Sequence, residues 1–247
     1  VSRLALLFDD MPGDLPALAD RQAEVVDWVQ NHSAMEHLAV CPTYYSDDPV
    51  LDRVFARRPA NYLERLGQQL APDVEVFWTG EEVCSRALSS GHLRSVKQRL
   101  GRAPLIWDNY PVNDGDRMSR HLHLRGFTGR PATLGGEVTG HAINPALQPT
   151  LTCIPAITLA QSYRQGDDYA YLAATRLAAV GVLGEELGGL VCDDLLSLED
   201  AGLGRLSEKR KHELKQRYKA FDHPGAREIL AWLEGTYQVT DEVVQTQ

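Results

Sequence analysis

Short, almost purely apolar runs alternate with amphipathic segments along the first two-thirds of this chain. Continuous apolar runs of this length are typical of parallel strands that are buried on both faces. Segments of helical period between such strands favour a parallel α/β architecture. The predicted strands are Leu4–Phe8, Leu38–Cys41, Val74–Trp78 and Leu105–Trp107, with a weaker one at residues 138–143.

Three helices are predicted between these strands. Asp14 is expected to cap the first of them, since a side-chain oxygen before a helix satisfies its free N–H groups. The spacing of apolar side chains predicts the buried face of each helix. These faces comprise Leu18, Val25, Val26 and Val29 with Trp28 alongside, then Tyr62, Leu63, Leu66 and Leu70, and then Leu93, Val96 and Leu100.

Polar side chains follow each predicted strand at the point where it ends. They are Asp9-Asp10, Thr43-Tyr44-Tyr45, Thr79-Gly80, Asp108-Asn109 and Asn144-Pro145. In a (β/α) barrel the carboxyl ends of all strands meet at one face, where active sites are built. A doubly wound sheet places its ligand at one switch point, which involves fewer strands. Polar groups at five strand ends therefore predict an α/β fold of the TIM-type (β/α) barrel class.

From about Ser162 the pattern changes to helices without strands. Residues 171–190 are rich in Leu, Ala and Val, although their glycines lower the helix propensity. Ser207 is predicted to cap a charged helix, and His223-Pro224-Gly225 to break the chain before a helix at 226–233. The last dozen residues are polar and expected to fray. We predict a barrel domain over residues 1–162 and a helical appendage over residues 163–247.

The composition excludes several classes of partner. The 247 residues carry a formal net charge of −9 and no long block of Lys or Arg, so nucleic acid is an unfavourable partner. No run approaches the roughly 18 apolar residues of a membrane span, and no signal peptide is recognisable. The four widely spaced cysteines are predicted to be buried free thiols, which suits a reducing, cytoplasmic location.

The pair Asp9-Asp10 has the chemistry of a catalytic site. Adjacent strand residues point to opposite faces, so both carboxylates reach one site only where the strand ends. Two carboxylates in one pocket repel each other, which raises one pKa and leaves one acid and one anion near neutral pH. Glycoside cleavage requires this division. Two alternatives remain: a polar turn without chemistry, or a Mg²⁺-binding cluster that adds Asp14.

The segment Ile106–Asp114 is the most distinctive in the chain. It places the aromatic face of Trp107 beside amide and carboxylate groups, a common means of holding a pyranose ring. Taken singly, a residue such as Trp107 is more often part of the core, and the neighbouring amide and carboxylate groups are what favour sugar binding. The histidines of His121-Leu122-His123 lack a third ligand at metal spacing and are predicted to lie on the surface.

Five motifs in this order resemble glycoside hydrolase family 84, the O-GlcNAcases and related bacterial β-N-acetylglucosaminidases. They are Leu6-Leu7-Phe8-Asp9-Asp10, Cys41-Pro42-Thr43-Tyr44-Tyr45, Trp78-Thr79-Gly80, Ile106-Trp107-Asp108-Asn109 with Asn113-Asp114, and Asn144-Pro145. The resemblance covers residues 4–160. It implies a retaining hydrolysis of β-linked N-acetylglucosamine, in which the substrate's own acetamido oxygen is the nucleophile and an oxazoline is the intermediate.

The resemblance also implies a role for each matching residue. Asp9 would orient the acetamido nitrogen, and Asp10 would be the general acid and then the general base. The substrate-binding residues implied by the same motifs are Tyr45, Trp107, Asn109, Asp114 and Asn144. No metal and no organic cofactor is needed for this chemistry. The implied partner is a glycan or glycoprotein that bears N-acetylglucosamine, and the C-terminal helices could support an oligomer.

The sequence departs from the family pattern in two respects. In the family, the strand with the paired aspartates is the fourth of eight, so the five strands here correspond to the fourth through eighth. We therefore expect the isolated chain to be weakly active or inactive, and a non-catalytic carbohydrate-binding protein is the alternative. Position 44 is Tyr where relatives often carry an acidic residue.

Overall fold

The computed structural model describes residues 2–240, which form two compact units. The first unit comprises residues up to 108 together with 133–142, and the second comprises 109–132 and residues from 143 onward. Helix α5 (Pro149–Gln165) runs through the position predicted as the boundary between residues 162 and 163. The units describe packing, and the predicted domain boundary itself stays a prediction.

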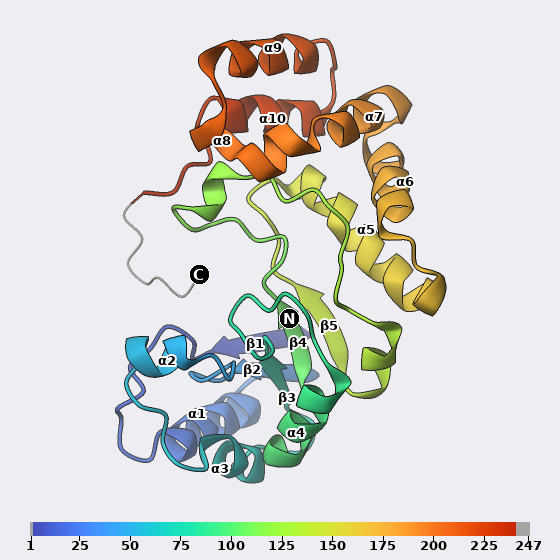
Figure 1. The fold of residues 1–247 in the computed structure, drawn as a ribbon. Coiled ribbons are helices and arrows are strands. Elements are labelled where there is room, and N and C mark those ends of the chain that lie inside the picture. The colour runs from blue at the N-terminus through green and yellow to red at the C-terminus, as the bar shows by residue number, and fades with distance from the viewer. Residues whose placement is uncertain (1, 241–247) are drawn as a thin grey trace. The chain divides into compact units, whose positions relative to one another are not determined.

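The first unit contains a sheet in the order β1-β2-β3-β4-β5 (Figure 1). Pairing is parallel from β1 through β4, as the alternation of strands and helices predicted. The strand ends lie within one or two residues of the predicted ones. The strands are β1 (Arg3–Leu7), β2 (His37–Cys41), β3 (Glu75–Trp78), β4 (Leu105–Asp108) and β5 (Gly140–Ile143).

Helices α1 (Leu18–His32), α3 (Tyr62–Gln69) and α4 (Ser90–Leu100) lie along one face of this sheet (Figure 1). The helices pack against one another in chain order, α1 on α3 and α3 on α4. Strands β2 and β3 are buried at consecutive residues, as expected of parallel strands covered on both faces. The strand residues that are fully or almost fully buried include Leu38, Val40, Val76, Trp78 and Ile106.

The prediction that every strand is buried on both faces is wrong for β1. Its residues alternate between exposed and half-buried, and Leu7 is 52% exposed. Strand β1 lies at the edge of the described sheet and pairs only with β2 there. The apolar run therefore predicted the position of β1 correctly but did not predict the burial of its side chains.

The start of α1 also differs from the prediction. Asp14 does not cap this helix. The residue at the N-cap position is Ala17, which has a left-handed backbone conformation and forms no side-chain hydrogen bond to the helix. Leu18 and Val26 are buried as predicted, whereas Val25 and Trp28 are exposed. The helix packs on α3, and only part of its broad apolar stripe is buried.

The other two predicted helices of the first unit are confirmed. Their predicted apolar residues are buried, and the Ser89 side chain caps α4 by accepting from the backbone N–H of His92. A further short helix, α2 (Pro49–Val54), is capped by Asp48, whose side chain accepts a hydrogen bond from the backbone N–H of Val50. The sequence analysis did not include this helix.

The second unit is helical and has its own apolar core, centred on Trp232, Tyr218 and Ile154. The predicted helix over residues 171–190 is two helices, because Gly184 has a positive φ of 82° and ends the first. The elements are η1 (Met118–Arg120), α5, η3 (Gly166–Asp168), α6 (Tyr171–Leu183), α7 (Glu185–Asp193), the π-helical η4 (Leu196–Ala201), α8 (Gly202–Arg205), α9 (Glu208–Tyr218) and α10 (Pro224–Leu233). A 3-10 turn, η2, spans Ala132–Gly136.

The caps predicted for the last two helices are partly confirmed. Ser207 caps α9 by accepting from the N–H of Arg210, and Leu214 and Tyr218 on its apolar face are buried. Helix α10 begins at Pro224 itself, because His223 acts as its cap and proline is favoured in a first helical turn. Of the last dozen residues, 241–247 lie outside the described residues.

The cysteines are free, as predicted, but their burial differs. Cys41 is buried, Cys84 and Cys192 are half-buried, and Cys153 is exposed on α5. Burial raises the pKa of the Cys41 thiol, and the charges of Asp9 and Asp10 raise it further. None of the helices within residues 2–240 has the length and apolarity needed to cross a bilayer.

Candidate functional site

Asp9 and Asp10 form a turn directly after β1. The backbone N–H of Phe8 donates to the carbonyl of Cys41 at 2.8 Å, so pairing with β2 extends to the residue before the pair. Asp10 then adopts a left-handed backbone with φ of 56°. Aspartate tolerates this region better than most residues. The turn removes the strand alternation that would otherwise point two adjacent carboxylates to opposite faces.

The Asp9 carboxylate is half-buried and incompletely satisfied. Its Oδ1 is buried and has no hydrogen-bond partner within residues 2–240. Burial raises the pKa of Asp9, a backbone hydrogen bond lowers it, and the Asp10 charge raises it again, for a net upward shift. A buried carboxylate oxygen without a donor is costly, and such an atom suits a ligand that brings an N–H group.

We expect Asp9→Asn to stabilise the fold at neutral pH by up to about 1 kcal/mol, a small effect because the group is partly exposed. The folded pKa lies above the ordinary value of 3.8, so the folded state binds more protons in that window. Stability therefore falls as pH rises from 3.8 through the folded pKa.

Thermal unfolding of both proteins at pH 7 and at pH 3.5 checks this prediction. The gain from Asp9→Asn should be present at pH 7 and absent at pH 3.5, where both proteins carry a neutral group. A variant that is less stable than the parent at pH 7 would contradict it.

A buried network of polar side chains supports the backbone of the Asp9-Asp10 turn. Thr43 Oγ1 donates to the Phe8 carbonyl and accepts from Gln22 Nε2, both at 2.7 Å. The Tyr62 hydroxyl donates to Gln22 Oε1 and accepts from the Thr43 backbone N–H. These side chains are 0–2% exposed, so their bonds lie in a medium that strengthens them. The network fixes the backbone from which Asp9 projects.

The loop after the pair is held by Gly13. Its N–H donates to the Phe55 carbonyl at 2.7 Å. A Cβ at this position would lie 2.1 Å from the Tyr44 hydroxyl oxygen, so only glycine fits. Tyr44 is fully buried and donates to the Ala56 carbonyl at 2.6 Å. The tyrosine that departs from the family pattern therefore packs beneath the loop and holds it.

Tyr45 and Trp107 occupy the ends of two other strands. Tyr45 follows β2, is 6% exposed, and accepts from the Thr79 N–H through its carbonyl at 2.9 Å. Trp107 is half-buried in β4 and meets Phe77 edge to face, with ring centroids 5.0 Å apart. The strand register places Trp107, Phe77 and Cys41 on the sheet face opposite α1, α3 and α4.

A buried hydrogen bond between His141 and Asp108 lies at the end of β4. His141 Nε2 lies 2.9 Å from Asp108 Oδ2, and both side chains are 6% exposed or less. Asp108 directly precedes Asn109 in the chain. This pair joins β4 to β5 at the point where the chain leaves the first unit.

The second unit holds the amide residues of the predicted site. Asn144 Nδ2 donates to Asn109 Oδ1 at 3.0 Å, so two predicted sugar-binding residues 35 positions apart are in contact. Asp114 is exposed. Asn113 beside it is fully buried, donates to the His121 carbonyl and to Gln148 Oε1, and accepts from the Leu147 N–H. Asn113 thus fixes the loop that presents Asp114.

The prediction that His121 and His123 are surface residues is wrong. His123 is half-buried, stacks on Tyr110 at 5.5 Å and hydrogen-bonds the Pro111 carbonyl at 2.9 Å. Burial lowers its pKa. Both rings hold the loop between β4 and α5.

The supporting residues were the part of the site that sequence reasoning missed. Gln22 and Tyr62 lie within helical patterns, where an apolar face gives no sign of a polar contact. Asn113 stood inside a quoted motif without a role. Within residues 2–240, no group of three or more His, Cys, Asp or Glu side chains could hold a metal ion, so Asp9, Asp10 and Asp14 do not form one there.

Comparisons with known proteins place this chain among related sequences and folds. A family model described as β-N-acetylglucosaminidase matches residues 1–187. Protein O-GlcNAcase from Mus musculus is 30% identical over 169 residues, which are 65% of this chain and 18% of the relative. The enzyme of the same description from Rattus norvegicus matches to the same extent.

A solved structure extends the likeness to the fold. A mutant of the O-GlcNAc hydrolase of Thermobaculum terrenum superposes with a TM-score of 0.72 at 28% sequence identity. The match covers 96% of this chain and 58% of that one. Together with the five-stranded sheet, this match confirms the predicted fold class, part of a (β/α) barrel followed by helices. The chain spans less than a fifth of the length of the curated relatives it matches.

Proposed function

This chain belongs to the β-N-acetylglucosaminidase family, and we propose that it carries the acid/base machinery for hydrolysis of β-linked N-acetylglucosamine with retention of configuration. The observation that carries the proposal is the turn after β1, where the buried Oδ1 of Asp9, which has no hydrogen-bond partner among residues 2–240, belongs to a carboxylate next in sequence to a second one. That arrangement suits a substrate with an N–H group next to the bond that is cleaved. A 2-acetamido sugar has this pattern.

In the proposed reaction the acetamido oxygen attacks the anomeric carbon as the glycosidic bond breaks. Asp10 gives its proton to the departing oxygen, and the acetamido group closes to an oxazoline that keeps its N–H proton and is therefore an oxazolinium ion. Asp9 accepts a hydrogen bond from the acetamido N–H and stabilises the positive charge that develops on that nitrogen. Asp10 then removes a proton from water, which opens the oxazoline. The tethered nucleophile gains the high effective molarity of an intramolecular reaction.

The raised pKa of Asp9 fits this role. In the free protein, burial disfavours the anionic form. An N–H donor and a growing positive charge favour the anion, so the carboxylate becomes a stronger acceptor as the reaction proceeds. The interaction is thus greater in the transition state than in the free protein.

The remaining site residues are proposed to hold the sugar. Tyr45 would contact the acetamido group and Trp107 would line its pocket. Asn109 and Asn144, already hydrogen-bonded to each other, would bind sugar hydroxyls as a pair of amides. Exposed Asp114 would accept from the outer hydroxyls.

The mechanism predicts a strict requirement for the acetamido group. A form of the protein that hydrolyses an aryl N-acetyl-β-glucosaminide should show at least about 10³-fold lower kcat/KM on the matched aryl β-glucoside, because the nucleophile is missing. Release of the aryl chromophore measures both. Equal rates would contradict substrate assistance, and binding of N-acetylglucosamine without any turnover would favour the non-catalytic alternative.

The natural partner is proposed from the same chemistry. A glycoprotein or glycan with terminal β-linked N-acetylglucosamine fits the site, and the relatives from mouse and rat are described as protein O-GlcNAcases. A cytoplasmic location and an oligomer formed through the C-terminal helices are part of the same proposal.

A further inference from the structure

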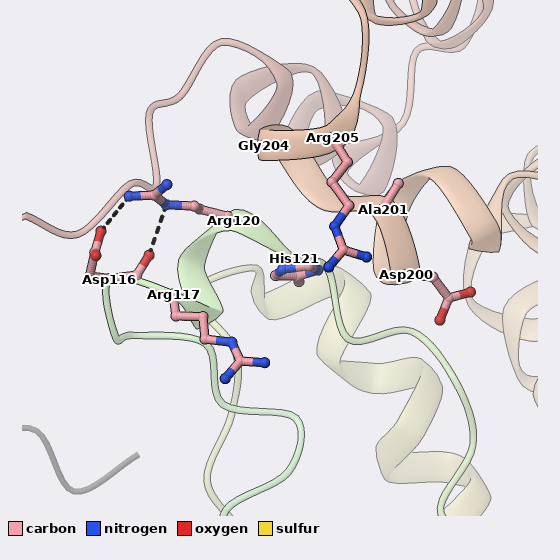
Figure 2. A pocket seen from close by; sticks show the side chains of 8 residues that line it. All are labelled: Asp116, Arg117, Arg120, His121, Asp200, Ala201, Gly204 and Arg205. Atoms are coloured by element: carbon pink, nitrogen blue, oxygen red, sulfur yellow. Dashed lines mark hydrogen bonds and ion pairs between the residues drawn. The ribbon is translucent and has the colours of Figure 1, made fainter.

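A cavity of about 600 Å³ lies in the second unit, and its lining includes none of the residues assigned above. Two segments line it: the loop around η1, two residues after Asp114, and the junction of η4 with α8. Figure 2 shows Arg205 projecting from α8 and Arg117 from the η1 segment, with His121 between them in this view.

The acidic residues of this cavity are already neutralised. Asp116 Oδ1 pairs with Arg120 Nη2 at 2.8 Å. Asp200 accepts two hydrogen bonds from Arg125, at 2.9 and 2.6 Å. Each cavity carboxylate therefore has a guanidinium partner.

Two cavity arginines have no such compensation. Arg117 and Arg205 form no ion pair or hydrogen bond through their side chains within residues 2–240. Two uncompensated guanidinium groups therefore line one cavity of a chain whose net charge is −9. A local excess of positive charge on an acidic chain attracts anions.

His121 is held in a fixed position between the two segments. Its Nδ1 donates to the Glu199 carbonyl at 2.6 Å, and Glu199 Oε2 accepts from the N–H groups of Leu124 and Arg125. A Cβ at Gly202 would lie 2.6 Å from the His121 ring, so the close packing requires glycine. The cavity wall is therefore built by specific contacts.

We propose that this cavity, whose wall includes His121, is an anion-binding site formed by Arg117 and Arg205, which receives a phosphorylated side chain of the polypeptide that carries the sugar. Guanidinium groups recognise phosphate oxygens through charge-assisted hydrogen bonds. The cavity is much larger than one phosphate ion, which favours a group attached to a chain. The inference that the phosphate belongs to the sugar-bearing polypeptide rests on the proposed function. The inference that the cavity binds an anion rests on the cavity alone.

The test is a calorimetric titration of the whole chain at low salt with three probes: inorganic phosphate, a phosphoserine peptide, and the same peptide with serine. We expect the phosphopeptide to bind at least tenfold more tightly than either other probe. Arg117→Gln and Arg205→Gln should each weaken phosphopeptide binding about tenfold, the effect of one charge-assisted hydrogen bond.

Arg164→Gln is the matched control, since Arg164 is an exposed arginine of α5 outside the cavity. Equal weakening by Arg164→Gln, or no weakening by the two cavity variants, would overturn the proposal. If the phosphopeptide bound no more tightly than free phosphate, the inference that the anion belongs to a polypeptide would be overturned. Thermal unfolding checks that each variant folds, and a second substitution to Lys should restore part of the affinity at either position.

The titration needs no turnover. Failure of the chain to hydrolyse N-acetylglucosaminides would therefore leave its result unaffected. Loss of anion binding would likewise leave the acid/base proposal untouched.

Discussion

In a form of the protein that hydrolyses N-acetylglucosaminides, Asp10→Asn should lower kcat on a substrate with a poor leaving group by about 10³-fold, within the range that general acid/base catalysis contributes. Asparagine preserves the size of the side chain and its compatibility with the left-handed backbone at this position, so the turn should survive. What is lost is the proton for the departing oxygen.

The leaving group supplies the diagnostic measurement. An aryl substrate with an acidic phenol needs little protonation, so its first step should lose much less rate than that of an alkyl glycoside. Asp14→Asn is the matched control, because Asp14 is an exposed aspartate four residues along the chain. Full activity of Asp10→Asn on both substrates would remove the proposed acid, and an equal loss in Asp14→Asn would show that the loss is not specific to Asp10.

Asp194→Ala should destabilise the second unit by about 3 kcal/mol, as expected when one partner of a buried ionic network is removed. The Asp194 side chain is 2% exposed. Its Oδ1 accepts from Arg210 and Arg217, each at 2.8 Å, and its Oδ2 accepts from the Tyr218 hydroxyl at 3.1 Å. The substitution leaves the buried Tyr218 hydroxyl without this acceptor.

Urea unfolding followed by helical circular dichroism measures this loss. Asp193→Ala is the control, since Asp193 is the exposed neighbour at the end of α7 and should change stability by less than about 0.5 kcal/mol. Similar unfolding midpoints for the two variants would show that the network contributes little.

Arg210 shows why local charge patterns mislead. The run Glu208-Lys209-Arg210-Lys211 is predicted to be a solvated helix face. Lys211 does pair with Glu208 on that face, but Arg210 reaches Asp194 at the end of another helix. Asp194 lies 16 positions away in the chain, and no sequence pattern predicts that it is buried.

The position of Asp9 and Asp10 at the end of a strand was predictable from the sequence, whereas the burial that raises the pKa of Asp9 was not. An apolar run followed by two carboxylates identified the strand end correctly. The residue with the raised pKa in the structure is Asp9, through burial that depends on its surroundings. Sequence reasoning gave the neutral form to Asp10, a role that the experiments above address.

Features governed by short-range physics followed from the sequence alone. The apolar runs determined the strands, helical spacing determined α3 and α4, and serine before a helix determined the cap of α9, because each depends on residues a few positions apart. The catalytic candidates are local in the same sense, since Asp9 and Asp10 are adjacent and terminate one strand.

Tertiary packing determined the features that depend on distant partners. These are the exposure of Leu7, the start of α1, the support of the Asp9-Asp10 turn by Gln22 and Tyr62, and the contact between Asn109 and Asn144. The physical reason is desolvation: how much water a group loses, and which donor replaces it, depends on segments that meet only in the folded chain. The Asp9-Asp10 turn was therefore identified by sequence, while the unpartnered oxygen that suggests its ligand was visible only after folding.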